Sequence, residues 1–105
     1  MAKKILFITF LFFSNFSFSQ KRINKLSVYP NPFTFSTKIT FESDNEKNVL
    51  LIVKDVLGKT VYREEYPTRI GKNSISFFKD NLGSGVYILA IQNSKELISK
   101  RFVIK

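Results

Sequence analysis

Few residues in this chain of 105 could carry covalent chemistry, and their spacing argues against it. Ser84 lies between Gly83 and Gly85, where a nucleophile could be exposed on a sharp turn. A serine needs a base to become nucleophilic, however, and the sequence has no histidine and lacks the glycine spacing of a nucleophile elbow. Glu64 and Glu65 are neighbours on an expected strand, so their carboxylates point to opposite faces and cannot share acid-base work. These patterns predict a protein that is not an enzyme.

Metal and redox sites lack their usual ligands in this sequence. Without cysteine or histidine, the chain excludes disulfides, thiolate chemistry and the common zinc and iron-sulfur sites. The segment Asp44-Asn45-Glu46 offers too few oxygen atoms for calcium and does not form an EF-hand loop. We therefore expect no cofactor, no metal and no small-molecule substrate.

Residues 1–19 have the pattern of a secretory signal peptide. Two lysines precede an apolar run, Ile5–Phe13, which is far shorter than the roughly 20 residues that a membrane-spanning helix needs. Small residues at Ser17 and Ser19 suit signal peptidase, so we expect cleavage between Ser19 and Gln20. A retained anchor is the alternative. The leader predicts export through the inner membrane to the periplasm, and the absence of cysteine excludes a lipoprotein anchor.

The charge of the chain points to anionic partners. Seventeen Lys and Arg stand against eight Asp and Glu, a formal net charge of +9, and loss of two lysines with the leader leaves +7. Glycans, lipid headgroups and nucleic acids are the partners that such a charge favours. Aromatic residues adjoin cations at Tyr62-Arg63 and Arg101-Phe102, as in nucleic-acid binders, but secretion argues against that use. Lipopolysaccharide is the more natural anionic partner outside the inner membrane.

The rest of the chain alternates polar and apolar residues with a period of two, which is typical of strands. Gln20–Lys25 is short, basic and poor in apolar residues, so we expect a flexible arm there and a single domain over residues 26–105. Turn residues separate about seven short segments, and no segment shows helical periodicity. This spacing predicts an all-β, immunoglobulin-like β-sandwich of antiparallel strands. The expected strands are residues 26–29, 38–42, 49–53, 60–66, 74–77, 86–91 and 97–104.

Individual segments predict their place in this sandwich. Val49–Val53 is continuously apolar, as in a central strand covered on both faces. Asp55–Gly58 predicts a hairpin in which Gly58 takes a left-handed conformation. Thr60–Tyr66 carries several charges and is followed by proline, which places it near a sheet edge. The expected core consists of Phe41, Leu51, Val53, Val61, Ile75, Phe77, Leu82, Tyr87, Leu89 and Phe102.

Five landmarks follow one another along the chain: Val28–Phe33, Val53–Val61, Gly71–Ile75, Leu82–Leu89 and a terminal Lys100–Lys105. In this order they resemble the C-terminal sorting domain (type A) of type IX secretion system substrates, over residues 26–105. The resemblance implies an immunoglobulin-like sandwich at the extreme C-terminus of proteins that Gram-negative bacteria secrete or display at the cell surface. It also implies a non-catalytic signal that directs an exported protein across the outer membrane.

The resemblance further implies partners and site residues. The partners are the outer-membrane type IX translocon and its sortase-like peptidase, which cuts ahead of the domain and often couples the cargo to anionic lipopolysaccharide. The sorting motif would comprise Tyr29, Pro30, Asn31, Pro32, Gly58, Gly71, Asn73, Leu82, Gly85 and Tyr87. Translocon recognition would fall to Lys100, Arg101, Phe102, Val103 and Lys105.

Structural roles for the same residues remain open. Pro30-Asn31-Pro32 can simply end a strand stiffly, Gly58 can serve its hairpin, and Tyr87 can belong to the core. The final cations can belong to a solvated strand. Between the expected signal cleavage and Leu26 there are six residues, where the resembling proteins carry a cargo domain. The alternative function is therefore a stand-alone secreted sandwich that binds anionic envelope polysaccharide or lipopolysaccharide.

Overall fold

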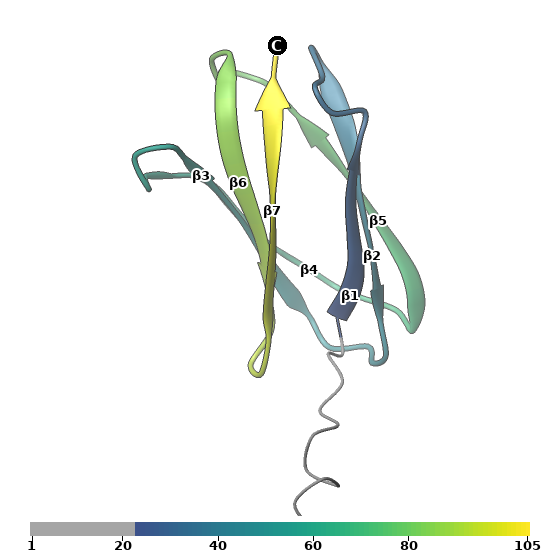
Figure 1. Cartoon of the computed structure of the whole chain (residues 1–105). Helices are drawn as coiled ribbons and strands as arrows, with labels where there is room; N and C mark the ends of the chain where they lie inside the picture. Colours follow the sequence, from purple (N-terminus) through teal and green to yellow (C-terminus); the bar gives the residue numbers. More distant parts are fainter. Residues whose placement is uncertain (1–22) are drawn as a thin grey trace, which may run out of the picture.

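The computed structural model describes residues 23–105, which form seven strands in two sheets (Figure 1). The first sheet has the order β1-β2-β5 and the second the order β4-β3-β6-β7, and all these neighbours pair antiparallel. The strands are β1 (Ile23–Tyr29), β2 (Ser36–Ser43), β3 (Val49–Asp55), β4 (Thr60–Tyr66), β5 (Gly71–Phe78), β6 (Gly85–Gln92) and β7 (Leu97–Ile104). The expected signal peptide and its cleavage between Ser19 and Gln20 lie outside the described residues.

The two sheets face each other and enclose one apolar core, which confirms the predicted immunoglobulin-like sandwich (Figure 1). Within residues 23–105 no helix is long and apolar enough to cross a membrane. Inward-facing residues alternate along each strand, because successive strand side chains point to opposite faces. The buried core consists of Ile23, Val28, Phe33, Ile39, Phe41, Val49, Leu51, Val53, Ile75, Phe77, Tyr87, Leu89, Ile91, Phe102 and Ile104.

Two residues of the expected core are only partly buried. Val61 lies on the edge strand β4, beside an irregularity in its pairing with β3 between Val53 and Lys54. Leu82 belongs to the connection between β5 and β6 and packs against the core from the end of the sandwich. Their apolar character placed both in the expected core, but it carries no information on whether a neighbouring segment covers them.

The flexible arm expected over Gln20–Lys25 is wrong for its last three residues. The side chain of Ile23 is 1% exposed, and its backbone pairs with Ser43 of β2. Burying one such side chain contributes roughly 1.5–3 kcal/mol, and the pairing of Ile23 and Asn24 with β2 adds to this in ordering the segment. Lys25 takes a positive φ of 56°, and the register shifts between Asn24 and Ser27, so that a polar segment continues the strand.

The central position predicted for Val49–Val53 is confirmed, but its cover on both faces is not. Strand β3 lies between β4 and β6, and its inward residues are fully buried. Leu50 and Ile52, which point to the other side, are only half-buried, since no described segment packs on that face. Strand β4 is an edge strand, as its charges predicted.

Candidate functional site

The connection between β1 and β2 adds one residue to the edge of the last strand. Phe33 pairs in parallel with Ile104, although the two residues come from opposite ends of the domain. The N–H of Phe33 donates to the carbonyl of Val103 (3.1 Å), and the N–H of Lys105 donates to the carbonyl of Phe33 (2.8 Å). The last three residues of the chain are therefore held by the connection that follows β1.

Asn31 strengthens this attachment with its side chain. Its Oδ1 accepts a hydrogen bond of 2.9 Å from the N–H of Val103, 72 residues away. On its other side the connection is held by Thr37, a buried residue of β2 whose hydroxyl donates to the carbonyl of Pro30 (2.6 Å). We call the group formed by Asn31, Phe33, Val103 and Lys105 the C-terminal clamp.

The Pro30-Asn31-Pro32 segment both ends a strand and takes part in this clamp. Strand β1 stops at Tyr29, as two nearby prolines predicted. The peptide bonds Tyr29–Pro30 and Asn31–Pro32 are both cis. The structural role expected for the segment is confirmed, and the clamp adds a second role that its sequence did not show.

An aromatic cluster lies beneath the clamp. Phe33 stacks on Phe102, with ring centroids 5.8 Å apart and planes at 27°. Tyr87 stacks on the same ring at 5.7 Å, and Phe77 meets it edge-on at 5.8 Å. Such aromatic pairs contribute about 0.5–1.5 kcal/mol beyond their area burial. Since Phe102 is fully buried, the terminal strand is fixed to the core from below and to the clamp along its edge.

The five residues assigned to translocon recognition have two different environments. Phe102 is in the core, and Val103 is half-buried in the clamp. Lys100, Arg101 and Lys105 are exposed. The strand therefore presents cations to solvent while its aromatic residue anchors it, and Lys100, Arg101 and Lys105 are its accessible members.

Most residues of the expected sorting motif lie at the same end as the clamp. Gly85 faces Ile104 across the β6–β7 pair, and the hydroxyl of Tyr87 donates to the carbonyl of Gly83 (2.7 Å). This confirms the core position predicted for Tyr87, with its hydroxyl at the edge of the core. Leu82 precedes these residues and packs against the core from the same end.

Gly58 completes the β3–β4 hairpin as the sequence predicted. It has a φ of +85°, which other residues adopt only at about 1–2 kcal/mol. Its N–H donates to the carbonyl of Asp55 (3.0 Å), and Oδ1 of Asp55 accepts from the N–H groups of Leu57 and Lys59 at 2.9 Å each. These hydrogen bonds within the turn account for the conformation of Gly58, so no binding partner is needed to explain it.

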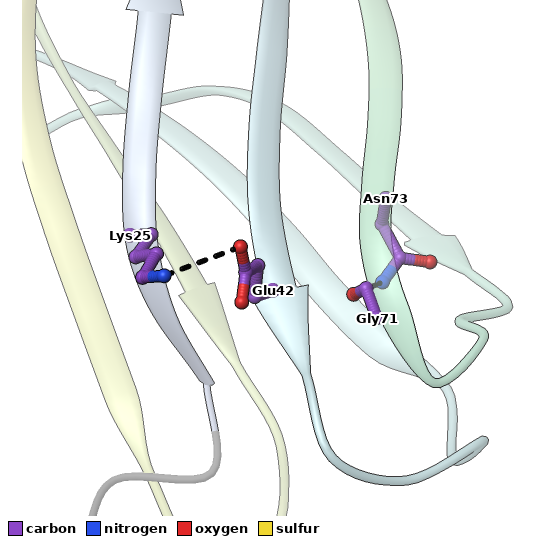
Figure 2. Close-up of polar contacts among 4 residues, drawn as sticks. All are labelled: Lys25, Glu42, Gly71 and Asn73. Carbon is purple, nitrogen blue, oxygen red and sulfur yellow. Dashed lines mark hydrogen bonds and ion pairs between the residues drawn. The ribbon is translucent and has the colours of Figure 1, made fainter.

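Gly71 and Asn73 lie at the opposite end of the sandwich, at the start of β5 (Figure 2). Gly71 pairs with Ser43, which is also the partner of Ile23. The side-chain amide of Asn73 donates to the carbonyls of Arg69 (2.9 Å) and Gly71 (3.1 Å), and its Oδ1 accepts from the N–H of Arg69. These two residues close a local loop and take no part in the clamp.

An ion pair lies beside this loop on the neighbouring strands (Figure 2). The Nζ of Lys25 is 3.6 Å from Oε2 of Glu42, and the two side chains are 72% and 44% exposed. Exposed pairs of this kind contribute at most about 1 kcal/mol. The pair joins β1 to β2 but gives this end no chemistry of its own.

Phe33 and Thr37 contribute to the candidate site but were not among the predicted site residues. Phe33 directly follows Pro32 and belongs to no alternating segment, so the period-two pattern gave it no buried position. The partner of Thr37, the carbonyl of Pro30, depends on how the connection folds back. Phe33 closes the Val28–Phe33 landmark, but its apolar character alone does not place it in a site, since many exposed residues share that character.

The arrangement can hold and present a charged strand, and it includes no nucleophile beside a base. In the part of the chain that the structure describes, no three carboxylates gather as a metal site requires. Away from the clamp, on β4, the hydroxyls of Tyr62 and Tyr66 hydrogen-bond to each other. There, burial and the hydrogen bond to the hydroxyl of Tyr62 raise the pKa of Tyr66 above its usual range.

Comparison with known proteins gives one family. A family model described as a secretion system C-terminal sorting domain matches residues 27–105. No curated protein sequence matches the chain. Among solved structures, a β-glucosidase from Listeria innocua in complex with glucose is similar over 83% of this chain and 17% of its own, with 10% identity and a TM-score of 0.44. The chain thus spans less than a fifth of that enzyme.

Proposed function

The chain belongs to the secretion system C-terminal sorting domain family, and from that premise we propose that its sandwich is the export address that the outer-membrane type IX translocon reads. The family is a non-catalytic sorting signal of type IX secretion. The proposal for this chain is that the folded domain follows a leader into the periplasm and then directs export to the cell surface or the medium. The sortase-like peptidase would cut ahead of Ile23, since the strand begins there.

The C-terminal clamp is the observation that carries this proposal. Through it, the Pro30-Asn31-Pro32 segment and the last residues of the terminal strand become parts of one surface, although they lie some 70 residues apart in sequence. A partner that reads both segments therefore recognises the folded sandwich and rejects an unfolded chain. We assign the reading to exposed residues of the two segments and beside them: Tyr29 and Asn31 on one side, and Lys100, Arg101 and Lys105 along the terminal strand.

A reporter assay tests the proposal directly. A fluorescent reporter with its own signal peptide would precede Gln20–Lys105, which includes both sheets and the whole core. We expect reporter at the surface or in the medium of type IX-competent cells, and in the periplasm of a translocon-deficient strain. Periplasmic retention in both strains would overturn the proposal.

Charge variants then locate the reading surface without disturbing the core. Replacing Lys100, Arg101 and Lys105 with glutamine keeps Phe102 in place, and we expect export to fall at least five-fold. The matched control replaces three exposed lysines elsewhere, Lys47, Lys72 and Lys95, and should export normally. Equal loss in the two triple variants would indicate that total charge, and not this strand, is read.

A further inference from the structure

The outer face of the four-stranded sheet carries apolar side chains at positions that solvent reaches. Its inner residues are identified by their burial, so the alternate residues point outward. Ile88 is 46% exposed and Leu97 56% exposed, and Leu50 and Ile52 are half-buried without a described segment over them. The apolar residues on this side, which we call the outer apolar face, are Leu50, Ile52, Val86, Ile88, Ala90, Leu97 and Val103.

The outer face of the three-stranded sheet shows that this composition is not general to the surface. Its outward residues are mostly hydroxyl-bearing or charged, and apolar rings occur near one end, at Tyr29 and Phe78. The polar residues on that side are Asn24, Ser27, Lys38, Thr40, Glu42, Lys72, Ser74 and Ser76. The outer face of the three-stranded sheet is thus mostly polar, whereas that of the four-stranded sheet is mostly apolar. Exposed apolar patches often mark interaction sites.

The outer apolar face is hollowed at its middle. Ala90 pairs with both Ile52 and Ser99, so two small side chains lie beside a larger one. Ile88 and Leu97 also line this hollow, which has a volume of about 260 Å³. Its size suits one bulky apolar side chain, the type of anchor that dominates protein interfaces.

Cations flank this hollow. Ile88 pairs with Lys54 on one side and with Arg101 on the other, and Arg63 pairs with Ile52. All three cations are exposed. Among strand residues that point this way in the described part of the chain, Glu65 supplies the carboxylate. An occupant with carboxylates on either side of an apolar anchor would therefore find complementary charge.

We propose that the outer apolar face binds a protein segment of the export machinery that presents one bulky apolar side chain flanked by carboxylates. The proposal rests on the proposed function and adds a second recognition surface to the clamp. Arg101 lies on this face and on the strand that the clamp holds, so the two surfaces adjoin. A second copy of the chain is the weaker occupant, since a two-fold contact through this face would bring like charges together.

The first test is export of the full chain from type IX-competent cells, measured as the fraction in the medium or at the surface. Ile88→Lys with Leu97→Lys removes the anchor pocket at two exposed positions, and we expect export to fall at least ten-fold. The matched control, Ser74→Lys with Ser76→Lys, adds the same charge to the polar sheet and should export normally. Thermal unfolding of each purified variant shows that the fold is kept. Normal export of the Ile88 and Leu97 variant would overturn the proposal.

The second test addresses the chemistry of the occupant without export, so that it stands if the proposed function fails. The labelled full chain is titrated with a synthetic peptide that has one phenylalanine between aspartates, and amide chemical shifts are followed. We expect shifts at Ile52, Ile88 and Ala90 that Ile88→Lys abolishes and that an analogue with lysines in place of the aspartates weakens at least three-fold. Shifts elsewhere, no shifts, or the same shifts on concentrating the chain alone would each overturn the proposal, the last by identifying a second copy as the occupant.

Discussion

The two ends of the sandwich are closed in different ways. At one end the C-terminal clamp joins Asn31 and Phe33 to the last residues of the chain, 72 positions away in the case of Asn31 and Val103. At the other end Asn73 binds backbone groups of Arg69, four residues away, and the longer links from Thr68 to the carbonyls of Lys47 and Asn45 span 21 and 23. The clamp end therefore exists only when the whole sandwich has formed, whereas much of the opposite end is built from local loops.

This difference explains how a chain terminus can act as a signal of folding. A partner that reads local loops would also meet them in a partly folded chain. A partner that reads the clamp meets it only when β1, β2 and β7 are all in place. The following predictions test whether the clamp end depends on the core as strongly as this comparison requires.

The largest effect is expected from the aromatic cluster below the clamp. Phe102→Ala removes a fully buried ring that stacks on both Phe33 and Tyr87, and we expect a loss of about 3–5 kcal/mol in unfolding free energy. Urea unfolding followed by circular dichroism measures it. The control is Leu57→Ala, at an exposed position in the β3–β4 turn, which should change stability by less than about 0.5 kcal/mol. A Phe102→Ala loss below about 1 kcal/mol would contradict the central place given to the cluster.

A smaller and more local effect is expected from the two asparagines. Asn31→Ala and Asn73→Ala remove the same kind of side chain from opposite ends, and each should cost on the order of 1 kcal/mol. Hydrogen exchange distinguishes them: Asn31→Ala should speed exchange at Val103, whose N–H loses its acceptor, and Asn73→Ala should do so at Arg69.

The asparagine pair also separates structure from signalling. Export of the reporter should fall with Asn31→Ala and stay normal with Asn73→Ala, although the two variants have similar stability. Similar export losses in both would mean that the translocon responds to stability alone, and the distinction between the two ends would have no functional meaning.

The sequence predicted the parts of this molecule that depend on neighbours along the chain. Alternation, continuous apolar runs and the turn residues between them located all seven strands, and Asp55 with Gly58 predicted a hairpin whose bonds are now seen. The buried position of Ile23 was not predicted, because a single apolar residue among polar ones shows no periodicity. The pairing of Phe33 was not predicted, because its partner Ile104 is at the other end of the domain sequence. Local pattern does not specify such a pairing, which depends on how the sheets come together.

The apolar run Val49–Val53 shows a different limit. Continuous apolarity predicted cover on both faces, and the structure provides it on one. A pattern of apolar residues records that a surface avoids water, and it does not record whether the chain itself or a partner provides the cover. The outer apolar face is consistent with the second case, because its half-buried residues on β3 continue onto exposed ones of β6 and β7.

The smallest effect is expected at the opposite end, from the ion pair between Lys25 and Glu42. Both side chains are accessible to solvent, so water and salt screen the attraction between charges 3.6 Å apart. A double-mutant cycle with Lys25→Gln and Glu42→Gln should give a coupling below about 0.5 kcal/mol, and raising the salt concentration should reduce it further. A coupling above about 1 kcal/mol would mean that β1 is held at this end as firmly as at the clamp. The contrast between a cooperative end and a local one would then fail, because both ends would restrain the first strand equally.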